Sequence, residues 1–382
     1  MRQAIRDLPG SKIREVANAG LGRDDVLVFW FGESDEVTPE PIRQAAADSL
    51  ARGETFYSHN LGLPELRAAI AAYASALHGA IDVERIAVTS SGVTALMLAM
   101  QLLVGAGDEV VAVVPVWPNL TAQPAILGAP VTRVPLRPRA GRWQLDLQEL
   151  LAAVTPRTRV LLVNAPNNPT GWTLTRDEQQ ALLAHCRRTG TWIVADEVYE
   201  RIWFGGGPAA PSFLDIASPD DRLIVAHSFS KSFLMTGWRL GWLVLPRGQT
   251  DEAGKLLEFN SSCAPVFVQR GGLAALAMAD ALVPALVARL QACRDRLLSG
   301  LQGLPGLSVA SPPAGLYAFF RVDGEDDSLA FAKRLVAGFG LGLAPGCAFG
   351  SEGEGWLRWC FASRDPARLD LGLDRLRLAL RL

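Results

Sequence analysis

Short apolar runs alternate with amphipathic stretches through the middle of the chain. Val93–Val104 is apolar nearly all round, which predicts a buried helix. The other apolar runs are four to six residues long and predict strands at Arg85–Thr89, Glu109–Val114, Arg159–Val163, Thr191–Ala195 and Leu223–Ala226. Strands that are separated by helices at this spacing are typical of a parallel sheet covered on both faces.

Two helix starts carry capping residues. Asp146 is followed three residues later by Glu149, and Thr175 is followed in the same way by Glu178. This spacing is that of a capping box, in which each side chain bonds the backbone of the other residue. The second helix is expected to end near Gly190, because glycine is common just past a helix C-terminus.

The pattern changes after about residue 260. A long Ala- and Leu-rich stretch over Ala264–Leu301 predicts one or two helices. The elements expected after it are paired strands at Leu307–Ala310 and Gly315–Val322, a helix around Ser328–Ala337, a strand at Trp356–Phe361 and a terminal helix from Pro366. The sequence therefore predicts an α/β protein: a large domain with a mostly parallel central sheet flanked by helices, and a smaller α+β domain.

Composition excludes several classes of protein. The 382 residues carry 37 Lys and Arg against 39 Asp and Glu, so the net charge of −2 gives no electrostatic footprint for nucleic acid or for an anionic membrane. No signal peptide is evident in the first ten residues, and the apolar runs are too short to span a membrane. We expect a cytoplasmic protein that binds neither nucleic acid nor membrane.

The cysteines and histidines do not form a metal-binding pattern. The five cysteines include no Cys-x-x-Cys pair, and their odd number favours reduced, mostly buried thiols. The four histidines are scattered without ligand spacing, so we expect no metal site.

Polar residues follow several predicted strands directly. Ser90-Ser91-Gly92 lies between a strand and a helix, where glycine and the free N–H groups of a helix N-terminus suit a phosphate. Taken alone, this tripeptide favours an ordinary serine N-cap over a phosphate site. Asp196 ends another strand, and read alone it favours a helix cap or a loop acid over a partner for a protonated ring nitrogen. Because ligands bind at the carboxyl ends of parallel strands, these residues are candidates for one site.

A lysine stands in a serine- and aromatic-rich turn after the strand at Leu223–Ala226. The chain has four lysines (Lys12, Lys231, Lys255 and Lys333), and its other 33 basic residues are arginine. Lys231 is the one in this turn. A lysine amine can lose its proton and form a Schiff base, whereas an arginine cannot.

Four motifs in this order resemble the fold type I pyridoxal-phosphate aminotransferases of classes I and II, the aspartate-aminotransferase-like superfamily. The motifs are Asn168-Pro169-Thr170-Gly171, Asp196-Glu197-Val198-Tyr199, Ser228-x-Ser230-Lys231 and Gly237-Trp238-Arg239-Leu240-Gly241. The likeness runs from about Phe31 to Arg358. It implies an N-terminal arm and part of the small domain in residues 1–40, a large cofactor-binding domain in 41–270, and a small C-terminal domain in 271–382.

The resemblance assigns cofactor-binding roles to matching residues. Lys231 would hold pyridoxal 5′-phosphate as an aldimine and move the proton, while Asp196 would pair with the ring nitrogen. Asn168 and Tyr199 would bond the 3-oxygen of the ring, and Trp117 would stack on the ring, although a tryptophan of the core is the plain alternative there. The residues implied at the phosphate are Ser91, Gly92, Val93, Ser228 and Arg239.

The resemblance also assigns the substrate contacts. Arg358 and Gly32 would bind the α-carboxylate of an amino acid or 2-oxo acid. A surface strand arginine is the alternative for Arg358, and its apolar and aromatic neighbours disfavour it. Tyr57 would reach the phosphate of a partner subunit, which requires a homodimer with shared sites. Val93 stands where a hydroxyl residue is frequent in the family, so it offers only its backbone N–H. Aromatic residues at 29–31 weakly favour an apolar side chain on the substrate.

The activity implied is transamination between an L-amino acid and a 2-oxo acid by a ping-pong mechanism. A carbon–sulfur β-lyase on the same fold remains open. A regulatory protein with an aminotransferase-like body is disfavoured, since the likeness begins by Gly32 and leaves little room for an added DNA-binding segment. A nicotinamide dehydrogenase is unsupported, because no Gly-x-Gly-x-x-Gly follows a strand.

Overall fold

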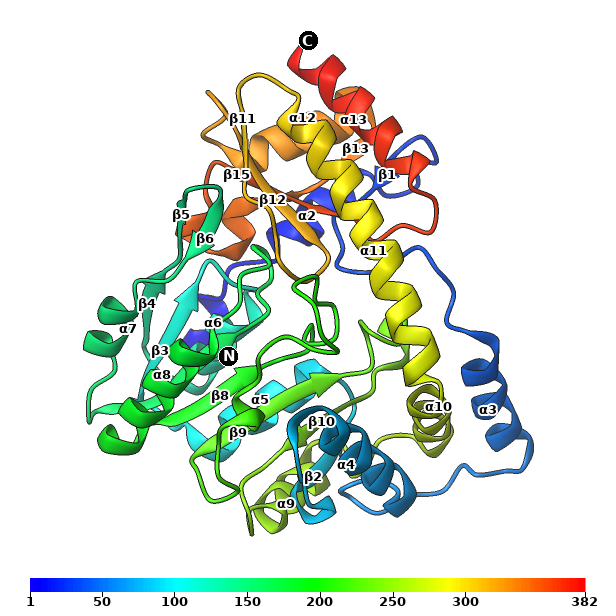
Figure 1. Cartoon of the computed structure of the whole chain (residues 1–382), viewed down its shortest axis with the longest axis vertical. Helices are drawn as coiled ribbons and strands as arrows, with labels where there is room; N and C mark the ends of the chain where they lie inside the picture. Colours follow the sequence, from blue (N-terminus) through cyan, green and yellow to red (C-terminus); the bar gives the residue numbers. More distant parts are fainter. Residues whose placement is uncertain (382) are drawn as a thin grey trace.

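A seven-stranded sheet forms the lower half of the molecule in the computed structural model, which describes residues 1–381 (Figure 1). Its strands, in spatial order, are β2 (Ile86–Thr89), β10 (Gly241–Val244), β9 (Leu223–Ser228), β8 (Trp192–Asp196), β7 (Thr158–Asn164), β3 (Glu109–Val114) and β4 (Val131–Pro135). All five strands predicted here are present, with ends displaced by at most two residues.

Only β10 runs against its neighbours. It pairs antiparallel with both β2 and β9, while β9, β8, β7, β3 and β4 pair parallel in turn. The carboxyl ends of six strands therefore meet at one edge of the sheet. The sequence pattern missed β10, a four-residue strand that directly follows a loop motif, and β4, an edge strand whose burial is mixed.

Both faces of the sheet are buried, as a parallel sheet requires. Along β3, Val111 and Val113 pack in one hydrophobic cluster, and the alternate residues Val110, Ala112 and Val114 pack in the other. The buried residues of helix α5 (Gly92–Leu103) belong to the second cluster. This helix is apolar nearly all round because it packs between the sheet and other helices. The remaining helices of this half are α3 (Glu40–Ala51), α4 (Pro64–His78), α6 (Asn119–Leu127), α7 (Leu147–Ala153), α8 (Arg176–Thr189), α9 (Thr250–Asn260) and α10 (Val266–Ala277).

The two predicted helix starts differ in outcome. Thr175 and Glu178 form a complete capping box at the start of α8, and Gly190 ends that helix in the left-handed conformation (φ 75°). Asp146 caps α7 through the amides of residues 148 and 149, but Glu149 binds the Arg137 guanidinium instead of returning to the cap. The expectation of a capping box at Asp146 was therefore wrong in its second half.

A four-stranded antiparallel sheet lies in the upper half of Figure 1. Its order is β11 (Leu307–Val309), β12 (Tyr317–Val322), β15 (Trp356–Cys360) and β14 (Ala344–Pro345). The helices α12 (Ser328–Phe339) and α13 (Ala367–Leu380) pack with it, and the long helix α11 (Ala279–Gln302) runs down toward the large sheet. The Ala- and Leu-rich stretch thus forms two helices, α10 and α11, which meet at Met278.

The N-terminal segment joins this upper half. β1 (Leu27–Val28) pairs in parallel with β13 (Leu341–Gly342), and α2 (Lys12–Ala19) packs on α12. Glu15 of α2 forms an ion pair with Lys333 of α12 at 2.6 Å. The short elements α1 (Gln3–Arg6) and the hairpin of β5 (Arg137–Arg139) and β6 (Arg142–Gln144) complete the chain. The domain limits at residues 40 and 270 stay predictions.

Across residues 1–381, no single helix is both long enough and apolar enough to cross a membrane. Helices α10 and α11 pass such a test only when they are taken together, and they are bent by 77° at their junction.

Candidate active site

A cavity of about 780 Å³ opens where the strand ends of the large sheet face β12, β15 and α2. It has the size of a cofactor site. Eleven of the residues singled out from the sequence line it: Gly32, Gly92, Val93, Trp117, Asn168, Asp196, Tyr199, Ser228, Lys231, Arg239 and Arg358. Two do not line it, namely Ser91 and Tyr57.

An anion cradle lies at the N-terminus of α5. The amide N–H groups of Gly92 and Val93 have no hydrogen-bond partner within residues 1–381, as expected for the first turn of a helix. Ser91 caps the helix by accepting from the Thr94 amide, so its hydroxyl serves the cap. Ser91 has φ 133°, a conformation that costs a non-glycine residue about 1–3 kcal/mol and that clusters at ligand sites.

Two glycines let this helix start approach the neighbouring strands. A Cβ on Gly241, the first residue of β10, would lie 2.6 Å from the Gly92 nitrogen. A Cβ on Gly92 would lie 3.0 Å from the Cβ of Ser228 at the end of β9. The cradle is therefore formed by three segments in close contact, and glycine is needed at its floor.

A positive charge and two hydroxyls complete the cradle. Arg239 is held in the left-handed region (φ 56°), and its Nη1 donates to the Thr236 carbonyl at 2.5 Å. The hydroxyls of Ser228 and Ser230 are 2.9 Å apart, and Arg239 approaches Ser230 at 3.5 Å. The helix dipole, the guanidinium and the hydroxyls together suit a phosphate dianion.

Asp196 ends β8 on the wall of the cavity. Its carboxylate is 3% exposed, and the one hydrogen bond within the described residues is from the Val198 amide at 3.4 Å. Burial raises the pKa of Asp196 to about 7, against the opposing effects of that amide and of the Lys231 charge. A cationic partner in the cavity would restore the carboxylate to its ionised form.

Two asparagines fix the neighbouring loop. The Asn164 amide group donates to the Asp196 carbonyl at 3.0 Å, and its oxygen accepts from the Asn168 backbone at 2.7 Å. Asn168 Oδ1 in turn accepts from Arg358 at 2.9 Å. The donating amide group of Asn168 is therefore the part left for a ligand.

Lys231 follows β9 and is half-buried. Its Nζ donates to the Gly32 carbonyl at 2.6 Å and lies 5.7 Å from the centre of the Tyr199 ring. Burial lowers the pKa of Lys231 to about 8, and the nearby positive charges of Arg358 and Arg239 act in the same direction. An amine of this kind is a nucleophile near neutral pH.

Arg358 is 2% exposed and lies on β15, which corrects the alternative of a surface strand arginine. It donates to Asn168 and to the Trp30 carbonyl, and its Cζ lies 4.3 Å from the centre of the Tyr317 ring. Its hydrogen bonds within the described residues are to an amide and a backbone carbonyl, not to an acidic side chain, and its Nε is unsatisfied. A buried arginine without a carboxylate is costly unless a ligand supplies one.

Tyr199 meets a residue that the sequence analysis did not single out. Its hydroxyl is 2.7 Å from that of Tyr317 on β12, and both side chains are buried. Trp117 is half-buried on the cavity wall, while Tyr57 is 90% exposed and outside the cavity.

Further residues to which the sequence analysis assigned no role also line the cavity. They are Asn164, Ser230, Tyr317, Asn119, Glu33 and Arg14. The first two stand at strand ends, a position that could have identified them. Of the aromatic residues at 29–31, Phe29 and Trp30 are buried in the core and only Phe31 lines the cavity, beneath the Arg14 guanidinium at 5.5 Å. The argument for an apolar substrate therefore loses most of its support.

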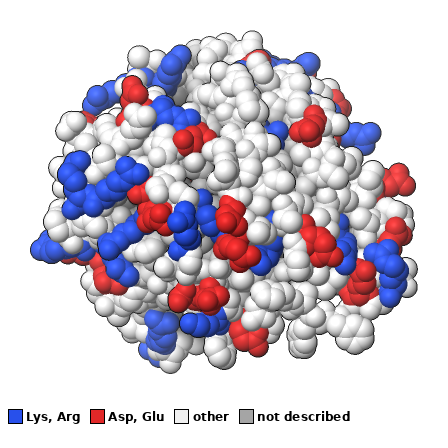
Figure 2. All heavy atoms as spheres, turned by 60° about the horizontal axis from the view of Figure 1, so that its bottom comes forward, with Lys and Arg blue, Asp and Glu red and all other residues white. Residues whose placement is uncertain are grey.

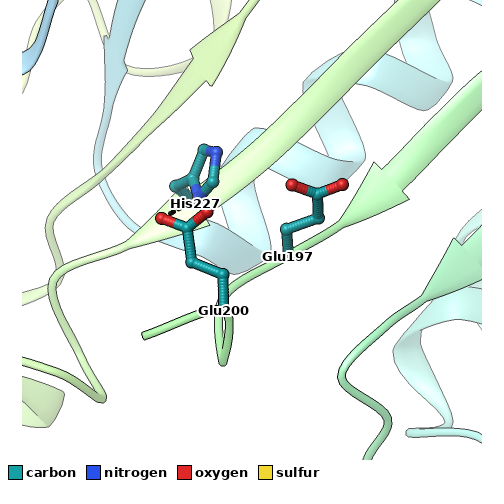
Figure 3. A group of neighbouring side chains, drawn as sticks. All are labelled: Glu197, Glu200 and His227. Atoms are coloured by element: carbon teal, nitrogen blue, oxygen red, sulfur yellow. Dashed lines mark ion pairs between the residues drawn. The ribbon is translucent and has the colours of Figure 1, made fainter. Parts of the chain in front are cut away.

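A buried charged cluster lies beneath the turn that follows β8. Glu197, Glu200 and His227 bring their polar atoms within 4.8 Å of one another (Figure 3). Both carboxylates are already hydrogen-bonded by neighbouring groups of the protein. Glu197 accepts from Ser212 and from the Phe213 amide, and Glu200 binds His78 at 2.9 Å.

His78 is the cation of this cluster. It also binds Asp215 at 2.7 Å, so it lies between two carboxylates. Burial opposes its charge, but the bonds to Asp215 and Glu200 outweigh burial and raise the pKa of His78 to about 10. The cluster ties α4 to the turn that carries Asp196 and Tyr199, and thereby holds that turn in place.

The fold and the cavity together define an aminotransferase. The structure is similar to that of N-succinyldiaminopimelate aminotransferase from Mycobacterium tuberculosis, with a TM-score of 0.93 and 30% identity over 99% of this chain and 100% of that one. It is also similar to an aspartate aminotransferase mutant from Thermus thermophilus, with a TM-score of 0.92, 28% identity and 99% of each chain covered.

The sequence leads to the same class. Residues 25–376 match the family described as aminotransferase class I and II, and the chain belongs to this family. An aspartate aminotransferase of Pyrococcus horikoshii is 32% identical over 97% of this chain and 94% of its own length. An arginine–pyruvate transaminase of Pseudomonas aeruginosa is 34% identical over 94% of this chain and 89% of its own.

Proposed function

We propose that this aminotransferase uses pyridoxal 5′-phosphate to move an amino group from an L-amino acid to a 2-oxo acid in two successive half-reactions. The observation that carries the proposal is one cavity that holds a depressed-pKa lysine, a buried carboxylate, an anion cradle and an unpaired arginine. Each of these matches one part of the cofactor or of the substrate.

The residues fit the cofactor at three points. The cradle of Gly92, Val93 and Arg239 would hold the phosphate, and the Lys231 amine would hold the cofactor covalently. Asp196 would pair with the ring nitrogen, which relieves the buried carboxylate. Asn168 and Tyr199 would donate to the ring oxygen, and Trp117 would stack on the ring. When bound, pyridoxal phosphate supplies an electron sink that stabilises a carbanion at the substrate Cα.

The chain supplies the remaining steps. Arg358 would bind the substrate α-carboxylate through its planar fork and so orient the Cα–H bond toward Lys231. The Lys231 amine would then take the Cα proton and return it on the cofactor side. The low pKa of this amine near 8 allows it to act as a base close to neutral pH.

We also propose that the active unit is a homodimer in which Tyr57 completes the phosphate site of the partner. In this chain Phe56 and Tyr57, in the loop after α3, and Phe259, in the last turn of α9, are each more than 80% exposed. Helices α3 and α9 lie in the lower part of Figure 1. The face in Figure 2 shows acidic and basic side chains side by side, with broad uncharged areas between them. Exposed aromatic side chains of this kind favour a protein partner.

The test is reduction of the purified protein with borohydride followed by peptide mapping. We expect the pyridoxyl group on Lys231, and a label on Lys12, Lys255 or Lys333 would overturn the assignment. Amino acid added without any 2-oxo acid should convert the cofactor and release one equivalent of 2-oxo acid, as a ping-pong half-reaction does. Continuous release of pyruvate and ammonia from a cysteine-type substrate would instead support the β-lyase.

A further inference from the structure

Tyr317 lines the cavity and contacts Tyr199 there. The hydroxyl lies 2.7 Å from that of Tyr199, and the two rings meet edge to face with centroids 5.8 Å apart. Tyr199 comes from the turn after β8, whereas Tyr317 comes from β12 in the other sheet. Within residues 1–381, each hydroxyl has the other as its sole hydrogen-bond partner.

The position of the Tyr317 hydroxyl is fixed by its surroundings. The Arg358 guanidinium covers the ring at 4.3 Å, and the side chain is fully buried. On another side lies Gly32, where a Cβ would come within 2.0 Å of the Tyr317 oxygen. Glycine at position 32 therefore leaves the space that this hydroxyl occupies.

The direction of the bond follows from counting protons. Each phenol has one O–H, and burial raises the pKa of Tyr317 to about 12 and that of Tyr199 well above its usual range, so both keep their protons. If Tyr199 donates its proton to the ring oxygen of the cofactor, it has none left for Tyr317. Tyr317 must then donate to Tyr199.

We propose that Tyr317 is a positioning residue that donates to Tyr199, fixes its hydroxyl toward the cofactor and strengthens it as a donor. This inference rests on the proposed function. Hydrogen bonds in a chain polarise one another, so the Tyr199 O–H becomes more acidic when its oxygen accepts from Tyr317. A stronger donor stabilises the ionised ring oxygen, which lowers the pKa of the covalent Lys231–cofactor link.

The test is a spectrophotometric titration of the holoenzyme with Tyr317→Phe, which removes one hydroxyl and keeps the ring over which Arg358 lies. Cooperative strengthening of about 10–30% in a charge-assisted bond corresponds to a shift of roughly a third of a pH unit. We expect the pKa of the Lys231–cofactor absorbance band to rise by about this amount. An unchanged pKa overturns the proposal.

Two further variants separate the relay from a general effect of losing a phenol. Tyr73 is half-buried, and its hydroxyl accepts from Arg201 at 2.6 Å outside the cavity, so Tyr73→Phe should leave the pKa of the Lys231–cofactor band unchanged. Tyr199→Phe should shift the pKa further than Tyr317→Phe does. The double variant should equal Tyr199→Phe, because Tyr317 acts through Tyr199. An additional shift in the double variant would contradict the relay.

The experiment also separates failure of the relay from failure of the proposed function. If the wild-type protein shows no pH-sensitive cofactor band, the proposed function is wrong and the relay is wrong with it. If the wild-type band titrates and Tyr317→Phe titrates at the same pH, the relay alone is wrong.

Discussion

The Lys231 amine should capture pyridoxal phosphate with an unusual dependence on pH. Only the neutral amine attacks an aldehyde, and its pKa of about 8 leaves about a quarter of it neutral at pH 7.5, compared with about 0.1% for an ordinary lysine. The difference is roughly 200-fold in reactive amine. We expect the capture rate of the cofactor-free protein to rise with a midpoint near pH 8.

The assay is stopped-flow absorbance after cofactor-free protein is mixed with excess pyridoxal phosphate between pH 6 and 10.5. Pyridoxal without phosphate serves as a second probe, because it lacks the phosphate ionisation near pH 6. Nα-acetyl-lysine gives the reference for an unperturbed amine. A midpoint above about pH 9.5 for Lys231 would refute the reasoning, since burial would then have no effect on this amine.

The same assay tests the contribution of a neighbouring charge. Arg358 lowers the pKa of Lys231, so Arg358→Gln should move the midpoint upward. Arg321 lies on the adjacent strand, pairs with Asp326 at the surface and is the matched control, so Arg321→Gln should leave the midpoint unchanged. Equal shifts in both variants would mean that Arg358 acts through general stability.

Three further results are expected. Asp196→Asn keeps the shape of the side chain but removes its charge, so steady-state assays should show transamination falling on the order of a thousandfold, about 4 kcal/mol of transition-state stabilisation. The loss of cofactor affinity should be much smaller, and near-full activity would assign Asp196 to a structural cap. A mixture of the Tyr57→Glu and Lys231→Ala proteins should recover at most about a quarter of wild-type activity per subunit, because half the dimers are hybrids with one intact site. No recovery, despite subunit exchange verified by mass spectrometry, would contradict the shared site. His78 has a folded-state pKa near 10 against 6.5, so its stabilisation is present below pH 6.5 and lost as pH rises toward 10. Urea unfolding should show that the wild type loses about 4 kcal/mol more than His78→Gln over this range, and parallel curves would refute it.

The sequence predicts the parts of the fold that local patterns encode. The central strands are uniformly apolar and bounded by turn residues, so β3 was located to the residue. The capping box at Thr175 is likewise a local signal. Strand β10 was missed because its role depends on a non-local contact: Gly241 packs on Gly92, and no pattern within four residues reports that approach.

The residues of the candidate site also divide into those that local sequence patterns identify and those that only the folded structure identifies. Lys231, Asp196 and Asn168 follow apolar strands directly, and their positions at one edge were deducible from the topology. Tyr317 lies inside a hydrophobic strand, where a single tyrosine resembles an ordinary core residue. Its importance depends on a hydroxyl 118 residues away in sequence, which only the folded structure brings within bonding distance.

The pairing of β1 with β13 has a consequence for the order in which the protein forms during synthesis. Residues 27–28 find their strand partner only when residues 341–342 have been made, so the first segment must wait for nearly the whole chain. Helix α2, whose Ile13 and Val16 are buried in the folded chain, likewise packs on helix α12, which is made late. Gly32, whose carbonyl accepts a hydrogen bond from Lys231, lies on the same N-terminal segment as β1. A polypeptide that stops before residue 341 therefore contains Lys231 but lacks the strand pairing that anchors the segment carrying the Gly32 carbonyl.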